Sequence, residues 1–484
     1  MAAFVSAQGV VESVMTIVEP VRHIGDVWGK QCVGKDDTFR MMRYVLRVEH
    51  DGRTLLHNTV TGQLSVLDQD EADALDSLPS AYSPWMEPLI AGHYLVPEDC
   101  DEHRQVIGLR RVLRLLMPQE TCENAAITNY TILPTTACNA RCYYCYECDV
   151  RKVTMTEQTA DDTVRFIAAH CGPEKQVRIR WFGGEPTVGV HRIEQICEGL
   201  RENGIGITST MTTNGYLFDE AMVSKARSLW NLQEVMISVD GTEEHYNEIK
   251  DYVGAQDNPY QRVLRNVGLL LDAGVRVNLR MNFDVGNYRD FADLLEEAKK
   301  RYHGNRFLRV YAFPVKGKYP DKTGEVHHGD LKTWGVDELV KLNDMACAAG
   351  LYRRRATLPS LHYTGCSASD PSCMVISPEG NLTRCVSIFD RENQIVGTVK
   401  AGITTAESCS LGRHLADPPE CTGCALFPDC VLIVGCPGGT DCFMKEIRIK
   451  YVAVMKSAYE QLKTGLKEES QDVHGGTESG ICAD

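Results

Sequence analysis

The sequence predicts an α/β protein built around a parallel β-sheet. Apolar, β-branched stretches bounded by turn residues alternate with longer stretches of helical periodicity from residue 127 onward. Strands that alternate with helices form a parallel sheet, because each helix returns the chain to the same end of the sheet. Functional side chains are then expected at the carboxyl ends of the strands.

The order of these elements is regular. The expected strands occupy residues 127–133, 176–182, 206–212, 234–239, 276–283 and 306–313. The expected helices occupy residues 158–170, 191–202, 220–229, 260–273 and 288–301.

The composition is that of a large globular protein with an acidic surface. The chain has 484 residues, and 66 acidic against 51 basic side chains give a formal net charge of −15. This charge argues against nucleic acid or an anionic membrane as the main partner. No apolar run reaches the roughly 18 residues of a membrane span, and the N-terminus lacks the basic start and cleavage site of a signal peptide. We therefore expect a soluble, cytoplasmic protein.

Three of the 20 cysteines follow the first strand as Cys138-x3-Cys142-x2-Cys145. In a large chain with no sign of secretion, clustered cysteines indicate metal binding rather than disulfides. Three thiolates can hold three irons of a [4Fe-4S] cube and leave the fourth iron open. A zinc site with Cys148 as its fourth ligand is the alternative.

This spacing, with Tyr144 before the third cysteine, resembles the signature of the radical S-adenosylmethionine (SAM) enzymes. The resemblance implies a partial (β/α)6 barrel, a cluster held by these cysteines, and SAM chelated at the open iron, where reduction cleaves it to a 5'-deoxyadenosyl radical. Gly183-Gly184-Glu185-Pro186, after the second strand, resembles the family's GGEP element, which meets the SAM amino group. A plain turn is the alternative for this motif.

The ends of the next strands carry further residues that the resemblance assigns to SAM. Asn214 follows strand three, and Ser238 and Asp240 at the end of strand four match residues that bind the ribose in the family. Asp240 as a helix N-cap is the alternative. Arg280 and Asn282 face one side of strand five, where one of them would meet the SAM carboxylate or form a structural ion pair.

The C-terminal third holds a second set of cysteines. Gly380-x4-Cys385 and Cys421-x2-Cys424-x5-Cys430 resemble the SPASM domain, although the next spacing, to Cys436, is five residues rather than the typical three. The resemblance implies two auxiliary [4Fe-4S] clusters, three clusters in all, one of them with an open iron in many members. Its interleaved pairing assigns auxiliary cluster I to Cys366, Cys373, Cys385 and Cys436, and auxiliary cluster II to Cys421, Cys424, Cys430 and Cys442. Two zinc ribbons are the alternative.

Nine cysteines have no assigned role, and most are expected as small buried hydrophobes: Cys32, Cys100, Cys122, Cys148, Cys171, Cys197, Cys347, Cys409 and Cys482. No side chain stands out as a catalytic acid or base. Candidates for substrate contact, with surface or packing roles as the alternative, lie near the auxiliary cysteines: His362, Tyr363, Asp370 and Arg384.

Residues 1–118 are predicted as a separate domain. Hairpin turns at Asp51-Gly52 and Thr61-Gly62 join short strands at 44–48, 54–56 and 63–67. Helices are expected at 70–78 and 83–90, and residues 92–96 resemble a winged-helix hairpin. This order resembles the precursor-recognition domain (RRE) of enzymes that modify ribosomally made peptides, which adds the leader peptide to a sheet edge. An accessory or oligomerisation domain is the alternative.

The remaining divisions are the barrel (119–335), a connecting region (336–365), the SPASM domain (366–445), and a C-terminal helix with a disordered tail (446–484). Together the resemblances imply a peptide maturase that forms a thioether from a substrate cysteine, with a reductant such as flavodoxin or ferredoxin as a further partner. A carbon–carbon crosslinker, a formylglycine-forming sulfatase maturase, a small-molecule enzyme and a non-catalytic electron-transfer protein are the alternatives. Val386 disfavours the sulfatase maturase, which carries Asp directly after its third SPASM cysteine.

Overall fold

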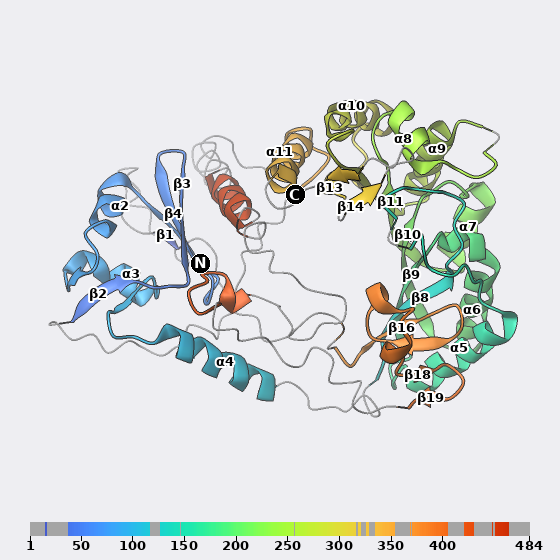
Figure 1. The fold of residues 1–484 in the computed structure, drawn as a ribbon, viewed down its shortest axis with the longest axis horizontal. Helices are drawn as coiled ribbons and strands as arrows, with labels where there is room; N and C mark the ends of the chain where they lie inside the picture. Colours follow the sequence, from blue (N-terminus) through green and yellow to red (C-terminus); the bar gives the residue numbers. More distant parts are fainter. Residues whose placement is uncertain are drawn as a thin grey trace, which may run out of the picture.

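The computed structural model describes residues 15–16, 37–116, 126–145, 147–255, 257–315, 318–320, 326–328, 334–353, 370–404, 421–429 and 451–463, with Ala368 and Arg448. Two bodies are visible in Figure 1. One, which we call the barrel body, is built around the long sheet that begins at residue 129; the other is formed by residues 15–16 and 37–116, which we call the N-terminal unit. None of the helices in these ranges is long and apolar enough to cross a membrane.

The long sheet confirms the predicted parallel α/β core. All six predicted strands are present with ends within two residues of those expected, and each pairs in parallel with the next. They are β8 (Asn129–Thr135), β9 (Gln176–Gly183), β10 (Gly206–Thr213), β11 (Leu232–Ser238), β12 (Arg276–Phe283) and β13 (Leu308–Pro314). Their carboxyl ends therefore lie along one rim, where the polar motifs were expected.

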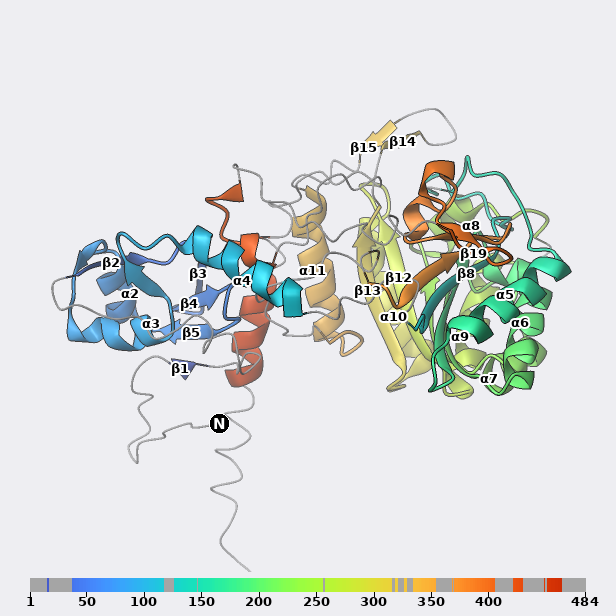
Figure 2. The same ribbon diagram turned by 90° about the horizontal axis from the view of Figure 1, so that it is seen from below.

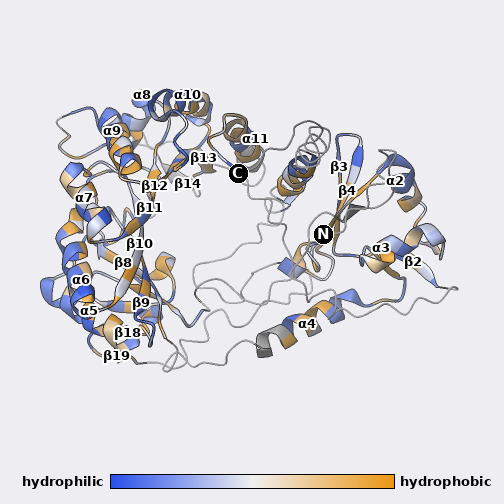
Figure 3. Ribbon diagram, turned by 180° about the vertical axis from the view of Figure 1, so that it is seen from behind, coloured by the Kyte–Doolittle hydropathy of each residue, from blue (hydrophilic) through white to orange (hydrophobic). Residues whose placement is uncertain are grey.

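The predicted helices cover one face of this sheet (Figure 1). They are α5 (Glu157–His170), α6 (Val190–Glu202), α7 (Glu220–Ser228), α9 (Pro259–Asp272) and α10 (Phe291–Tyr302). Trp181, Val235 and Leu279 on the strands and Ile196 and Leu270 on the helices belong to one buried core. In Figure 3 the hydrophobic colour follows the strands, and the outer surfaces of the helices are hydrophilic.

Two helices of the barrel body were not predicted. The first is α8 (Glu243–Lys250), a short polar helix that buries only Tyr246 and Lys250 and so has no apolar stripe. The second is α11 (Trp334–Ala348), which packs against β13. A small hairpin of β14 (Lys318–Pro320) and β15 (Val326–His328) lies between β13 and α11 in the chain.

A C-terminal segment extends the barrel sheet. Strand β16 (Cys373–Ile376) pairs in parallel with β8, so that Cys373 lies opposite Asn129. The sheet continues through antiparallel strands to the edge. These are β17 (Asn381–Thr383), β18 (Gly397–Thr398) and β19 (Gly402–Ile403).

The N-terminal unit contains the predicted strands and helices. Its four-stranded sheet has the order β1-β5-β4-β3, with β1 (Met15–Thr16), β3 (Val45–His50), β4 (Arg53–Asn58) and β5 (Leu64–Leu67). Helices α2 (Gln69–Leu75) and α3 (Glu87–Ala91) follow. The expected winged-helix strand is present as β7 (Leu95–Pro97), but it pairs with the unpredicted β2 (Thr38–Met41), whose other neighbour is β6 (Ser80–Ala81).

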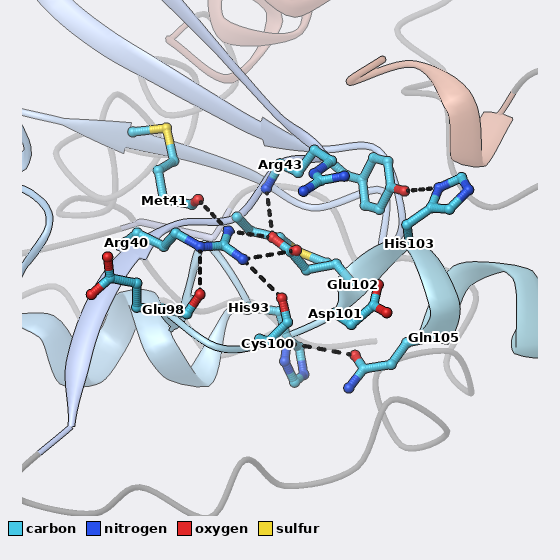
Figure 4. Close-up of polar contacts among 12 residues, drawn as sticks. Arg40, Met41, Arg43, His93, Glu98, Cys100, Asp101, Glu102, His103 and Gln105 are labelled. Atoms are coloured by element: carbon cyan, nitrogen blue, oxygen red, sulfur yellow. Dashed lines mark hydrogen bonds and ion pairs between the residues drawn. The ribbon is translucent and has the colours of Figure 1, made fainter. Parts of the chain in front are cut away.

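A long unpredicted helix, α4 (Glu102–Leu116), forms the last element of the N-terminal unit. The buried carboxylate of Glu102 accepts hydrogen bonds from the Arg40 guanidinium at 2.6 and 3.0 Å and from the backbone N–H of Arg43 at 3.1 Å (Figure 4). The same guanidinium donates to the carbonyl of Cys100 at 2.8 Å. These bonds attach the start of α4 to the strands of the unit.

Two further C-terminal segments pack on the N-terminal unit. Residues 421–429 place Phe427 in its main core, beside Leu89 and Val106. A helix over 451–463, within the region 446–484 where a C-terminal helix was expected, places Met455 in a second core with Leu46, on the other face of the four-stranded sheet. Figure 2 shows this red helix beside the blue strands. The last third of the chain is thus divided between the two bodies.

Candidate active site

The three cysteines of the first motif lie in the loop that leaves β8 at the carboxyl end of the sheet. Burial raises the pKa of the Cys138 thiol to about 12, and it also raises the pKa values of Cys142 and Cys145. The thiols are close enough that the Cys142 thiolate contributes to both other shifts. Coordination to iron would replace these protons, since a metal-bound thiol is deprotonated.

The spacing of the three cysteines, rather than a preformed metal geometry, indicates the cluster. Within the described ranges, no three His, Cys, Asp or Glu side chains are placed to hold one metal ion. A [4Fe-4S] cube takes each thiolate at a different iron, so its ligands surround a volume rather than meet at a point. Cys148, the proposed fourth zinc ligand, is exposed.

The glycines of the second motif are required by the cysteine loop itself. Gly183 has φ of +119°, and a Cβ there would collide with the Thr135 carbonyl oxygen. A Cβ on Gly184 would collide with the carbonyl oxygens of Thr136 and Ala137. The close approach therefore joins two backbone segments, whereas the sequence motif was interpreted as a ligand contact.

The Glu185 side chain is buried and joins the ends of β9 and β10. Its carboxylate accepts hydrogen bonds from the Thr187 backbone N–H at 3.1 Å, the Thr213 hydroxyl at 2.8 Å and the Asn214 backbone N–H at 2.7 Å. Burial raises the pKa of Glu185 despite these bonds. Asn214 in turn donates from Nδ2 to Asn139 Oδ1 at 2.7 Å, within the cysteine loop.

A buried polar network occupies the ends of β11 and β12. Lys250 Nζ lies 2.7 Å from Ser238 Oγ, 3.0 Å from Asp240 Oδ2 and 3.1 Å from Tyr144 OH. Tyr144 OH donates to Asp240 Oδ2 at 2.8 Å and accepts from Asn282 Nδ2 at 2.9 Å. Burial acts to lower the pKa of Lys250, but attraction to Asp240 and to the Cys142 thiolate outweighs it and raises that pKa.

The sequence singled out four members of this network and missed the fifth. Ser238, Asp240, Asn282 and Tyr144 meet, as expected of residues at one site, and Asp240 is not the N-cap of α8, which is Thr242. Nothing in the sequence indicated that Lys250 is buried, because a lysine in the last turn of a polar helix is usually exposed. The local turn after β12 supports the network, since Asn287 Nδ2 donates to the carbonyl of Asp240 at 2.8 Å.

Two polar groups at this rim have no hydrogen-bond partner within the described residues. They are the buried Nε of Arg280, whose guanidinium lies 5.4 Å from the centre of the Phe313 ring, and Nδ2 of Asn139. Arg280 is not ion-paired in the described structure. These donors, beside the cysteine loop and the strand ends, fit a ligand that carries a carboxylate and hydroxyl groups, as SAM does.

The auxiliary cysteines that the structure describes lie on both bodies. Cys373 is on β16 and Cys385 follows β17; Arg384 tightens this hairpin by donating to the carbonyl of Cys373 at 2.6 Å and to that of Asp370 at 2.7 Å. Cys421 and Cys424 pack against the N-terminal unit. The remaining predicted ligands and contact residues lie outside the described residues: Cys366, Cys430, Cys436, Cys442, His362 and Tyr363.

Two of the unassigned cysteines are buried in the barrel core, as expected of small hydrophobes. Cys171 is 3% exposed and Cys197 is completely buried. Cys32, Cys122, Cys409 and Cys482 lie outside the described residues.

Comparison with known proteins agrees with this geometry. Residues 132–298 match the model of the Radical SAM superfamily. The chain is 30% identical over 111 residues to the uncharacterized protein MJ0907 of Methanocaldococcus jannaschii, covering 22% of this chain and 37% of that protein. It is 24% identical over 273 residues to the GTP 3',8-cyclase of Clostridium perfringens strain SM101, covering 52% of this chain and 78% of that protein.

Solved structures show the same fold. The structure of native anSMEcpe with bound AdoMet superimposes with a TM-score of 0.53 at 17% identity, covering 70% of this chain and 99% of that one. Residues 132–298 therefore carry a radical SAM domain, which marks the protein as an enzyme and implies SAM and a [4Fe-4S] cluster as cofactors.

Proposed function

We propose that this protein is a radical SAM peptide maturase that binds a precursor peptide and forms a thioether from one of its cysteines. The main support for the proposal is the outer strand of the sheet in the N-terminal unit. Among the described strands, β3 (Val45–His50) is the last in its sheet and pairs only with β4. Its outer edge offers backbone N–H and C=O groups to an extended peptide, as in β-strand addition.

The two faces of this sheet are already covered. The helices of the N-terminal unit pack on one face, through Leu56 and Leu67, and the helix over 451–463 packs on the other, through Leu46 and Leu55. A peptide that approaches the sheet therefore meets its edge. Arg47, Glu49 and His50 lie along β3 and would contribute polar contacts to the bound peptide.

The rim of the barrel would hold the cofactors. Cys138, Cys142 and Cys145 would bind the cluster, and Arg280 would meet the SAM carboxylate. When bound, this pair supplies a 5'-deoxyadenosyl radical that removes a hydrogen atom from the substrate. The residues of this chain would shape the cofactor site: Gly184 brings the Glu185 strand end against the cysteine loop, and Asn282 donates a hydrogen bond to Tyr144.

Thioether formation also requires an electron acceptor. Joining a thiol to a carbon removes two hydrogen atoms: one leaves as the abstracted atom, and the thiol hydrogen leaves as a proton and an electron. SAM cleavage consumes one electron, and thioether formation releases one. The overall reaction is therefore balanced if the released electron is passed to an acceptor in the protein. Cys373, Cys385, Cys421 and Cys424, with the predicted ligands outside the described residues, would hold the auxiliary clusters that accept it, and flavodoxin or ferredoxin would supply the first electron.

The fold comparison supports a peptide substrate. The structure of native anSMEcpe with bound AdoMet and Cp18Cys peptide superimposes with a TM-score of 0.51 at 16% identity, covering 70% of this chain. A fold of this kind thus accommodates a cysteine-containing peptide in that protein.

A small-molecule substrate is the second candidate. The similarity to GTP 3',8-cyclase over 273 residues favours it. The N-terminal unit would then serve as a lid rather than as a peptide receptor.

Reconstitution distinguishes these functions. The purified protein is loaded anaerobically with iron and sulfide, reduced with dithionite, and assayed for SAM cleavage without substrate and with GTP. In a separate experiment it is co-expressed with each short reading frame beside its gene, and the encoded peptides are analysed. Three clusters predict about twelve irons per chain. The proposal expects a peptide that loses two hydrogens per crosslink and a cysteine that no longer reacts with iodoacetamide. Consumption of GTP with SAM would establish the second candidate, and no SAM cleavage by a fully loaded protein would refute both.

A further inference from the structure

Lys250 is a buried cation at the centre of the rim. Its side chain is 2% exposed, and lysine is rarely buried unless its charge is compensated. An ammonium group has three protons to donate, and Lys250 has three oxygen partners: Ser238 Oγ at 2.7 Å, Asp240 Oδ2 at 3.0 Å and Tyr144 OH at 3.1 Å. The group is therefore fully satisfied without solvent.

The same residue contacts the cysteine loop through its backbone. The carbonyl of Lys250 accepts a hydrogen bond from the Arg141 N–H at 2.8 Å, directly before Cys142. Three residues later, Val253 N–H donates to the carbonyl of Asn139 at 2.8 Å. The end of α8 is thus bonded to the loop on both sides of Ala140.

Tyr144 links the ammonium group to the cluster ligands. It stands between Cys142 and Cys145 in the chain, and its hydroxyl touches both members of the Lys250–Asp240 pair. Movement of the loop would separate these three groups inside the protein, where unpaired charges are costly.

A cluster in this loop would be anionic, because each thiolate brings a negative charge, and its reduction would add another. A buried cation nearby stabilises the reduced state more than the oxidised state, and little solvent is present to screen it. Asp240 acts in the opposite sense. The pair therefore places opposing charges beside the redox centre.

We propose that Lys250 is a positioning residue that holds the cysteine loop against the ends of β11 and β12 and raises the reduction potential of the cluster bound there. Ser238 and Asp240 then act first as partners of Lys250. The inference rests on the proposed assignment of Cys138, Cys142 and Cys145 as cluster ligands.

The test is the midpoint potential of this cluster in the full-length reconstituted protein. An EPR-monitored titration follows the signal that changes when SAM is added, because this change marks the cluster with an open iron. Lys250→Met removes the positive charge at similar size and should lower the potential. Asp240→Asn removes the opposing charge and should raise it. The double variant should return toward the wild-type value.

Matched variants separate charge from structure. Lys250→Arg keeps the charge and should stay near the wild-type potential. Lys225→Met, on helix α7, breaks an ion pair between an exposed lysine and Glu194 of helix α6 and should leave the potential unchanged. A Lys250→Met protein with an intact signal at the wild-type potential would overturn the inference.

If the Lys250→Met protein does not retain the cluster, the midpoint potential of the Asp240→Asn variant tests the inference instead. A raised potential supports the charge pair, and an unchanged potential overturns it. Failure of the cluster assignment itself is distinguishable, because the wild-type protein would then show no SAM-sensitive signal.

Discussion

The backbone N–H of Asn214 donates a hydrogen bond of 2.7 Å to the buried carboxylate of Glu185. The bond joins the turns that leave two neighbouring strands, β9 and β10. Glu185 therefore organises the rim through its side chain, and the ends of these strands depend on one carboxylate.

Removal of this carboxylate should destabilise the protein. Glu185→Ala leaves four donors without their acceptor, namely the backbone N–H and hydroxyl of Thr187, the Thr213 hydroxyl and the Asn214 N–H, and should cost about 3 kcal/mol of unfolding free energy. Glu185→Gln keeps an acceptor oxygen and should cost less. Urea unfolding of the metal-free protein measures both, with the exposed Glu202→Ala expected within about 0.5 kcal/mol of wild type. Equal losses for Ala and Gln would contradict this account.

Substitution of Gly184 should disturb the cysteine loop. The added Cβ of Gly184→Ala meets the backbone oxygens of Thr136 and Ala137, which cannot rotate away, so about 2 kcal/mol of stability should be lost. The reconstituted variant should also lose the iron of the SAM cluster. Gly108→Ala is the control, because this exposed glycine of α4 has open space around it and should gain up to about 1 kcal/mol. Full iron content in Gly184→Ala would show that the loop tolerates the displacement.

Glu102 should make stability depend on acidic pH. Burial acts to raise its pKa, but the hydrogen bonds from Arg40 and from the Arg43 N–H outweigh burial and lower it below the usual 4.5. A lowered carboxyl pKa adds stability above the unfolded-state pKa, and this stability is lost as the pH falls through the folded-state pKa. Wild type should therefore lose more stability than Glu102→Gln between neutral pH and about pH 4.

Urea unfolding across this pH range, with metal-free protein, checks the Glu102 prediction. Arg40→Met should cost about 3 kcal/mol at neutral pH, because the carboxylate remains buried without its cation. Asp76→Asn breaks an exposed ion pair with Arg47 and should change stability by less than about 1 kcal/mol. If the unfolding free energies of wild type and Glu102→Gln changed in parallel with pH, Glu102 would not be a source of the pH dependence.

The loop that carries Cys421 and Cys424 should depend on the N-terminal unit. Thr59 donates to the carbonyl of Ala425 at 2.6 Å, Arg110 donates to that of Phe427 at 3.1 Å, and the Arg110 guanidinium lies 4.7 Å from the centre of the Phe427 ring. Phe427→Ala should cost about 3 kcal/mol and, if these cysteines hold a [4Fe-4S] cluster, release about four irons per chain. Iron counting and SAM cleavage measure the effect, and cleavage should persist.

The matched control for Phe427 is Leu89→Ala, a truncation in the same core on helix α3. It should lower stability to a similar extent and keep the iron. Loss of iron in both variants would indicate general destabilisation rather than support of this loop.

The sequence by itself determined the elements and the cysteine motifs. Periodicity is a local property, so six strands and their helices could be placed within a few residues, and the spacing of Cys138, Cys142 and Cys145 marked the rim. Strand β2 was missed, and β7 was expected in a local hairpin, because pairing between distant segments leaves no local pattern. Helix α4 was also missed, although its amphipathic periodicity is local.

The tertiary structure alone decided how the motifs are supported. Only the fold shows that Gly184 is needed by the backbone of the cysteine loop, that the Cys421 segment packs on the N-terminal unit, and that Lys250 is buried. The physical reason is that a residue's type and spacing do not specify its distant partners. The energy of a buried charge such as Lys250 depends on oxygens brought to it by Tyr144 and Asp240, and these meet it only when the strands and the loop have assembled.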